Sequence, residues 1–277
     1  MRNAKYILAL LLLTVTVAVA QEGPPHPIQG SELDTVALPG QFWSTNGNLE
    51  PVEHNNVLTE NYFEQGATVF STAGHSVTLT PYIGVGFAFD TTGYSYNNKV
   101  DPSVGIKLNK YFRFGVFSAG TAYLDEHRFY NGGSASGMSY YGQYWVGWNP
   151  ISEQSSRFPG SSWGSAGNIA PVEHGNYIFL DYITQGYVAK RFGASKEQAL
   201  MPFAEFTVSK DTKGFDWENK TIEGAGLKYG VPKGEMYTEF GVGYTHENRF
   251  DSGLTSSGVK VFLNFSYAWN LFGRKAR

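Results

Sequence analysis

The sequence has no cysteine, only 4 methionines, and a charged fraction of 16%. Without cysteine the chain cannot form disulfide bonds, so burial and backbone pairing must hold it together. The small charged fraction suits a surface that is covered by lipid. No amphipathic helix of any length is present, and beyond residue 20 no apolar run is long enough for a membrane helix.

The first twenty residues have the pattern of an export signal. Arg2 and Lys5 supply positive charge, residues 6–17 form an apolar run, and residues 18–20 are small, as at a cleavage site. The alternative is an anchoring helix, for which the run is short. No cysteine follows the cleavage site, so a lipid-anchored lipoprotein is excluded. We therefore predict a signal peptide over residues 1–20.

The exported chain is mildly acidic. Loss of the two basic residues of the signal takes the formal charge from −3 to −5, which argues against nucleic acid as a partner. Residues 21–35 are rich in Pro, Gly and polar residues and predict a disordered leader. Residues 36–277 then predict a single domain. Its 33 glycines and 16% aromatic residues indicate a β-rich composition.

The chain contains an internal repeat. Residues 39–56 read PGQFWSTNGNLEPVEHNN, and residues 159–176 read PGSSWGSAGNIAPVEHGN. Further on, DTTGYSYNNK from Asp90 matches DTKGFDWENK from Asp211. We therefore predict two tandem copies of one supersecondary unit, about 36–150 and about 156–272.

Most of each copy alternates between apolar and polar or small residues, which predicts β-strands. In residues 75–90 the apolar set includes Val77, Leu79, Ile83 and Val85, while the opposite face is small or polar. These strands are longer than the five or six residues usual in soluble domains, and they suit tilted crossings of a membrane. Five strands per copy are clear: 56–70, 75–89, 98–109, 112–125 and 136–149, then 176–190, 198–210, 219–229, 234–247 and 257–270.

An apolar face on each strand fits either a soluble sheet or an outer-membrane barrel, and the polar face decides between them. It is dominated by Gly, Ala, Ser and Thr, with scattered charges at Lys107, Lys228, Glu205 and Glu239. A solvated face would carry a denser mixture of Lys and Glu. A narrow barrel lumen suits small side chains and paired charges, so we predict an all-β, antiparallel transmembrane β-barrel.

Aromatic residues cluster at strand ends, as expected of the two belts of a membrane barrel. Tyr96 and Trp217 are two of them, and the alternative is that such rings pack under the loops of a soluble barrel. The last strand, VKVFLNFSYAWNLF over Val259–Phe272, resembles the C-terminal strand of bacterial outer-membrane β-barrel proteins. That resemblance implies recognition by the outer-membrane assembly machinery. The basic tail 273–277 departs from it, because those proteins usually stop at the aromatic residue.

The number of strands follows from the loops. Linkers after the first and third clear strands of each copy are short, and those after the second and fourth are longer. Barrels have short periplasmic turns and long external loops, so consistent sidedness needs a sixth crossing in each copy. The candidates are residues 36–47 and 157–167, although both are broken by Pro-Gly. We predict 10–12 strands and favour twelve.

Three sets of repeated residues are candidates for chemistry. Glu53 with His54, and Glu173 with His174, could form a general base or half a metal site, but we favour the start of a strand that satisfies a tight turn. Glu126 with Arg128, and Glu247 with Arg249, share a strand face and predict a structural ion pair at the rim rather than a ligand site. The Asp-Thr-x-Gly segments predict turns, with too few carboxylates for a Ca²⁺ site.

The predicted function is a non-enzymatic, porin-like barrel in the outer membrane of a Gram-negative-type bacterium, in contact with its lipid. It would pass or bind a polar solute or glycan, with the lumen charges, Tyr96 and Trp217 as candidate ligand residues. We predict no cofactor and no metal. The alternatives are an outer-membrane enzyme acting on lipid or peptide and a secreted soluble glycan-binding protein. No GxSxG, HExxH, P-loop or dinucleotide motif is present, although six histidines leave a rim site open.

Overall fold

The computed structural model describes residues 37–72, 74, 76–130 and 132–271 of the 277-residue chain. The predicted signal peptide, the predicted leader and the basic tail 273–277 lie outside these residues. Within them, no helix is both long enough and apolar enough to cross a membrane.

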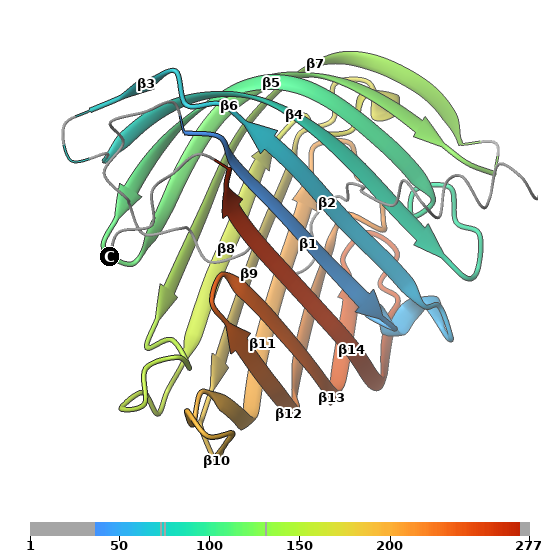
Figure 1. Ribbon diagram of the computed structural model, residues 1–277. Coiled ribbons are helices and arrows are strands. Elements are labelled where there is room, and N and C mark those ends of the chain that lie inside the picture. The colour runs from blue at the N-terminus through green and yellow to red at the C-terminus, as the bar shows by residue number, and fades with distance from the viewer. Residues whose placement is uncertain (1–36, 73, 75, 131, 272–277) are drawn as a thin grey trace, which may run out of the picture.

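The described chain forms a closed antiparallel barrel of twelve strands (Figure 1). Closure comes from pairing of the last strand with the first over residues 262–270 of β14 and 39–47 of β1. The short strands β3 and β10 add to the neighbouring long strands β4 and β11 and do not count as crossings. In chain order the strands are β1 (Pro39–Gly47), β2 (Leu58–Gly66), β3 (Phe70–Ser71), β4 (Val77–Asp90), β5 (Lys99–Phe112), β6 (Gly115–Arg128), β7 (Gly133–Trp148), β8 (Gly160–Gly167), β9 (Ile178–Gly186), β10 (Lys190–Phe192), β11 (Gln198–Asp211), β12 (Lys220–Lys233), β13 (Met236–Arg249) and β14 (Thr255–Asn270).

The preference for twelve strands is confirmed. The opening motif of each half supplies the additional crossing: β1 pairs with β14 and β2, and β8 pairs with β7 and β9. Pro39 is tolerated because it is the first residue of its strand, where a missing N–H costs little. Several strand ends differ from the prediction by a few residues. The turn between β5 and β6, for example, lies at residues 113–114 rather than at 109–112.

The two faces of the strands are oriented as the alternation predicts. On β4 the small polar residues Thr78 and Thr80 are 4% and 2% exposed, whereas Ile83 is 58% exposed. Polar residues therefore line the interior and apolar residues face outward, the reverse of a soluble sheet. Such an outward band is what lipid covers in a membrane barrel. Its members include Val104, Leu108, Phe117, Tyr140, Phe179, Ile183, Phe206, Leu227, Phe240, Val242, Val261 and Leu263.

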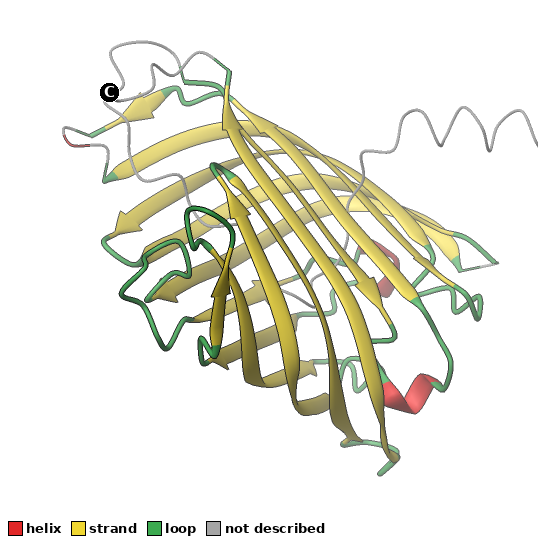
Figure 2. Cartoon of the chain, turned by 60° about the horizontal axis from the view of Figure 1, so that its bottom comes forward, coloured by secondary structure: helices red, strands yellow, loops and turns green. Residues whose placement is uncertain are grey.

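The barrel has two different ends. At the end where β1 begins and β14 finishes, which we call the turn end, β5–β6 and β12–β13 are joined by two residues each. The opposite end, the loop end, carries the connections 48–57, 91–98, 129–132, 168–177, 212–219 and 250–254. Figure 2 shows the two short 3-10 turns, η1 (Pro51–Glu53) and η3 (Pro171–Glu173), at this loop end.

The two halves of the barrel use the same sequence of elements. β4, β5 and β6 have 14 residues each, as do β11, β12 and β13, while β7 and β14 have 16. The halves meet at two seams, β7–β8 and β14–β1. Apolar side chains fill part of the interior in separate clusters. One consists of Trp145, Trp163, Leu180 and Tyr182, and another of Leu49, Leu58, Phe203 and Phe262.

Candidate functional site

Polar side chains from the loop end gather beneath the loops and form a buried network, which we call the loop network. Its carboxylates, cations and amides come from η1, η3, the loops after β4 and β11, and the adjoining ends of β5, β6, β12 and β13. Its main members are Glu50, Glu53, Asn56, Asp90, Asn97, Asn98, Lys99, Asp101, Glu126, Arg128, Glu173, Asn176, Asp211, Glu218, Asn219, Lys220, Glu247 and Arg249.

The turns after β4 and β11 shape the network. Asp90 Oδ1 accepts hydrogen bonds from the backbone N–H of Gly93 at 2.6 Å and from Asn98 Nδ2 at 2.6 Å. Gly93 has a φ of 82°, a conformation that glycine adopts without strain. Asp211 binds Gly214 N in the same way at 2.7 Å. The predicted turn chemistry is thus present in both halves. Within the described residues no group of three or more His, Cys, Asp or Glu could hold a metal ion.

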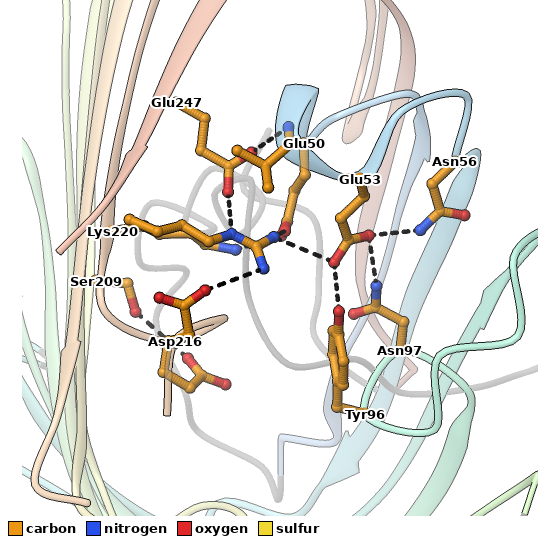
Figure 3. Close-up of polar contacts among 12 residues, drawn as sticks. Glu50, Glu53, Asn56, Tyr96, Asn97, Ser209, Asp216, Lys220 and Glu247 are labelled. Carbon is orange, nitrogen blue, oxygen red and sulfur yellow. Dashed lines mark hydrogen bonds and ion pairs between the residues drawn. The ribbon is translucent and has the colours of Figure 1, made fainter. Parts of the chain in front are cut away.

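The seam between β14 and β1 is bridged by a group that we call the β14–β1 clasp. Arg249 on β13 donates from Nε to Glu247 Oε1 at 2.8 Å, and from Nη2 to Glu50 at 3.2 Å and Glu53 at 3.4 Å. Glu247 Oε2 in turn accepts the backbone N–H of Val52 in η1 at 2.9 Å. Figure 3 shows Glu50, Glu53 and Glu247 pointing toward this central guanidinium.

The seam between β7 and β8 carries a matching group, the β7–β8 clasp. Arg128 on β6 donates from Nε to Glu126 Oε1 at 2.7 Å and from Nη2 to Glu173 Oε1 at 2.6 Å. Glu126 Oε2 accepts the backbone N–H of Val172 in η3 at 2.9 Å. Both ion pairs predicted from the i, i+2 spacing therefore form, and each also holds a 3-10 turn that lies across a seam. Charge-assisted hydrogen bonds from one guanidinium to two or more carboxylates fix geometry as well as adding energy.

An asparagine ties each clasp to its neighbouring turn. Asn56 Nδ2 donates to Glu53 Oε2 at 2.5 Å and to Asp90 Oδ2 at 3.0 Å. Asn176 Nδ2 donates to Glu173 Oε2 and Asp211 Oδ2, both at 2.7 Å. Glu53 accepts two more hydrogen bonds, from Tyr96 OH at 2.8 Å and Asn97 Nδ2 at 3.0 Å. The loops of each half are thus one connected unit.

The sequence-based interpretation of the Pro-Val-Glu-His motif is wrong in one respect. The motif does not start a strand: residues 51–53 and 171–173 are 3-10 turns, and β2 and β9 begin several residues later. Glu53 and Glu173 are buried, whereas His54 and His174 are exposed. The Glu and His of each pair therefore point apart, and the Glu binds an Arg that is distant in sequence. Glu53 reaches Arg249 because β14 closes onto β1, and Glu173 reaches Arg128 because β8 pairs with β7.

The two clasps are not chemically identical. Glu50 corresponds to Ala170, and Asn97 corresponds to Glu218. Lys220 Nζ donates to Glu50 Oε1. Burial and the nearby charge of Glu50 raise the pKa of Glu53 to about 7. Burial raises the pKa of Glu218 to about 7 as well, against the opposing attraction of Lys220.

Aromatic rings join the loops of the two halves. Tyr96 and Trp217 are stacked, with ring centroids 4.8 Å apart and an interplanar angle of 4°. Tyr94 stacks on Tyr96 at 5.3 Å, and Phe215 stacks on Trp217 at 4.7 Å. Each inner ring therefore has two stacked neighbours. Both inner rings also border a small cavity of about 40 Å³, together with Lys99, Arg128, Glu173, Glu218 and Lys220. A cavity of this size holds one or a few water molecules.

Deeper in the barrel, the predicted lumen charges are paired. Lys228 and Glu239 bind each other at 3.0 Å. Lys107 binds Glu64 at 2.5 Å, and Glu205 binds Lys260 at 2.8 Å. Glu64 and Lys260 were not among the site residues predicted from the sequence. For Lys260 the inward phase was the available signal, because it lies between the outward residues Val259 and Val261, whereas Glu64 lies between Phe63 and Gln65 and has no such signal.

No protein-family model matches the sequence, and no curated protein is significantly similar to it. Several solved structures are similar to the chain at low identity, with TM-scores under 0.5. An outer-membrane channel from Pseudomonas putida F1 has 10% identity and a TM-score of 0.46, covering 90% of this chain and 100% of that one. LpxR from Salmonella typhimurium has 8% identity and a TM-score of 0.41, covering 83% and 99%. The β domain of the Bordetella autotransporter Brka has 12% identity and a TM-score of 0.39, covering 85% and 100%. The chain resembles these bacterial outer-membrane proteins at low sequence identity.

Proposed function

We propose that the chain is an outer-membrane β-barrel of a Gram-negative-type bacterium that binds and passes a small polar solute, with a preference for cations. The observation that carries the proposal is the charge of the interior. Among the described residues, twelve buried carboxylates are accompanied by six buried lysine and arginine residues and by Arg128, whose side chain is 7% exposed. The apolar outer band supports the membrane location.

The excess of carboxylates has an electrostatic consequence. Charges of one sign that line a low-dielectric passage focus the potential along it, and rings of Asp and Glu favour cations in channels. The ion pairs at Lys107, Lys228 and Lys260 neutralise three of the carboxylates. The others gather at the loop end, where Arg128, Arg249, Lys99 and Lys220 balance them in part. A cation would meet this negative region first on entering from the loops.

The loop network also holds the passage closed at this end. The two clasps and the stack of Tyr96 on Trp217 lie where a solute would pass, and the cavity between them is small. Passage therefore requires that the loops move. Opening would break contacts within the loop network and leave the strand pairing of the barrel intact.

We also propose that the barrel derives from duplication of a six-stranded unit. Support comes from the equal lengths of corresponding strands and from the matching clasps, in which Glu126–Arg128–Glu173 corresponds to Glu247–Arg249–Glu53. In each clasp the 3-10 turn of one half binds the strand of the other half. A duplicated unit of this kind would close on itself through two equivalent seams.

The membrane location is tested first, because it is the simpler claim. The folded barrel should fractionate with outer membranes and migrate faster on gels before heating than after it. A protein that remains soluble without detergent and shows no such shift would contradict the location.

Conductance in planar bilayers tests the passage. We expect a small conductance for the native chain, and more frequent, cation-selective openings for Arg128→Met and Arg249→Met together, because both clasps lose their cation. The matched control is Arg113→Met, in the exposed turn between β5 and β6. Anion selectivity, or a folded double variant that conducts like the native barrel, would overturn the proposal.

A further inference from the structure

A serine and a histidine are hydrogen-bonded on the outer wall of the barrel. His246 Nδ1 lies 2.7 Å from Ser257 Oγ. The two residues are directly opposite each other on β13 and β14. Glu223 on β12 is directly opposite His246 on its other side. Serine, histidine and glutamate therefore form one row across three neighbouring strands, outside the loop network.

The row lies at the loop end of the outer wall. Glu223 and Ser257 are exposed and His246 is half-buried, so the row is open to the surroundings of the barrel. One step toward the middle of the strands, the outward residues are Tyr244 and Val259, which are 61% and 57% exposed. A polar row directly above an apolar band marks the level at which lipid headgroups meet acyl chains.

We propose that Ser257 and His246 form a hydrolytic site for the acyl esters of outer-membrane lipids, with Glu223 as a positioning residue. The proposal goes beyond solute passage and rests on the proposed membrane location. Three features carry it: a serine within hydrogen-bond distance of a histidine, a carboxylate in register with that histidine, and placement where lipid esters lie. A nucleophile, its base and an orienting acid are recognised by geometry rather than by sequence motif.

The reaction would proceed in two balanced steps. Ser257 Oγ attacks the ester carbonyl carbon while His246 Nδ1 takes the hydroxyl proton. The ester C–O bond then breaks, and His246 returns the proton to the leaving alcohol. Water next attacks the acyl-Ser257, again giving a proton to His246, and the fatty acid departs as Ser257 regains its hydrogen. Asn248, two residues along β13 on the same face, supplies a side-chain amide that can donate to the carbonyl oxygen.

The matching positions of the first half do not repeat the Ser257–His246 pair. The corresponding positions in the first half are Pro102, Asp125 and Ser136. Ser136 is exposed and lies opposite Asp125, as Ser257 lies opposite His246. Its hydroxyl accepts from Tyr123 OH at 2.8 Å instead. Ser136 is therefore a serine at the same register position that faces Asp125, itself 3.0 Å from His127 Nε2, and that has a tyrosine rather than a histidine as its hydrogen-bond partner, so it offers a matched control.

The experiment uses the full barrel folded in detergent micelles, with p-nitrophenyl decanoate as the probe. Ser257→Ala and His246→Ala should each lower kcat/KM by about 100-fold or more, within the range that base catalysis supplies. Ser136→Ala should leave the rate unchanged. Glu223→Gln should lower kcat with KM unchanged, and Glu223→Asp should restore part of the lost kcat, because a carboxylate in register with His246 can orient the imidazole. A purely structural role for Glu223 would instead lower the yield of folded barrel.

Two further measurements identify the nucleophilic serine and the lipid substrate. A fluorophosphonate ester should label Ser257 and not Ser136, as read by mass spectrometry of the heat-modifiable barrel. Release of fatty acid from phosphatidylethanolamine or from lipopolysaccharide, each in mixed micelles, then identifies which lipid supplies the ester. Folded barrel that hydrolyses none of the three esters, or a Ser257→Ala variant at the native rate, would overturn the proposal. Neither result bears on conductance, so the two proposals fail separately.

Discussion

Arg128 on β6 donates a hydrogen bond of 2.6 Å to Glu173 in η3, and the contact bridges the seam between the two halves of the barrel. The side chains are 7% and 3% exposed. The buried Arg128 guanidinium needs its carboxylate partners to offset the loss of hydration, and the buried carboxylates need the guanidinium for the same reason. The pair therefore fixes the position of η3 and contributes to the stability of the seam.

Removing this cation should destabilise the barrel strongly. We expect Arg128→Ala to lower the free energy of unfolding by about 3–5 kcal/mol, because Glu126 and Glu173 would stay buried without their charge partner. Urea titration of the barrel folded in lipid vesicles measures the change. Arg113→Ala, in an exposed turn, should change stability by less than about 0.5 kcal/mol. Equal effects of the two substitutions would show that the clasp has no structural role.

A second prediction concerns pH and Glu218. Burial raises its pKa from an ordinary 4.5 to about 7, so the folded state binds this proton more tightly than the unfolded state does. Its contribution to stability is therefore complete below about pH 4.5 and is lost as the pH rises to about 7. The loss is on the order of 1 kcal/mol per pH unit.

The Glu218→Gln variant isolates that contribution, because glutamine does not titrate. The free energy of unfolding of this variant, relative to that of the native chain, should therefore rise between about pH 5 and about pH 7, where Glu218 titrates. Urea unfolding at each pH measures the difference. Glu153→Gln, at an exposed position in the loop 149–159, serves as the control and should follow the native curve. Parallel curves for Glu218→Gln and the native chain would contradict the prediction.

The aromatic stack predicts coupling between two loops that are far apart in sequence. Trp217→Ala removes the partner of Tyr96, at a cost of about 1 kcal/mol beyond lost burial. Amide hydrogen exchange should therefore accelerate in residues 91–98 as well as in 212–219. Phe112→Ala, 58% exposed at the turn end, should leave both loops unchanged. Faster exchange confined to 212–219 would show that the stack does not join the halves.

The sequence predicted those parts of the fold that depend on local alternation. The inward phase of Thr78 and Thr80 and the outward phase of Ile83 followed from period-two patterning, because successive strand side chains point to opposite faces. The sixth crossing of each half followed from loop lengths. Glu126 and Arg128 could be paired from spacing alone, since i and i+2 share a face.

The remaining contacts depend on closure, which no local pattern encodes. The Arg249 contact to Glu53 forms because β14 pairs with β1, and the distance between the two residues in sequence gives no sign of it. The same holds for Tyr96 and Trp217, which patterning placed in an interfacial belt and the structure places against each other. Glu64, which binds Lys107, lies in a strand whose alternation is weak, so its role in the lumen was missed.

The last prediction concerns the stability that the lumen ion pair of Lys228 and Glu239 contributes. Lys228→Met should destabilise the barrel by about 3 kcal/mol, because Glu239 would remain buried with Tyr237 and Asn264 as its neutral donors. Adding Glu239→Leu should restore much of that loss, since an apolar pair of similar volume carries no desolvation penalty. A double-mutant cycle by urea unfolding measures the coupling, which should be at least about 1 kcal/mol. Additive losses would mean that the two charges act independently, and the lumen would then tolerate an unpaired carboxylate at this depth.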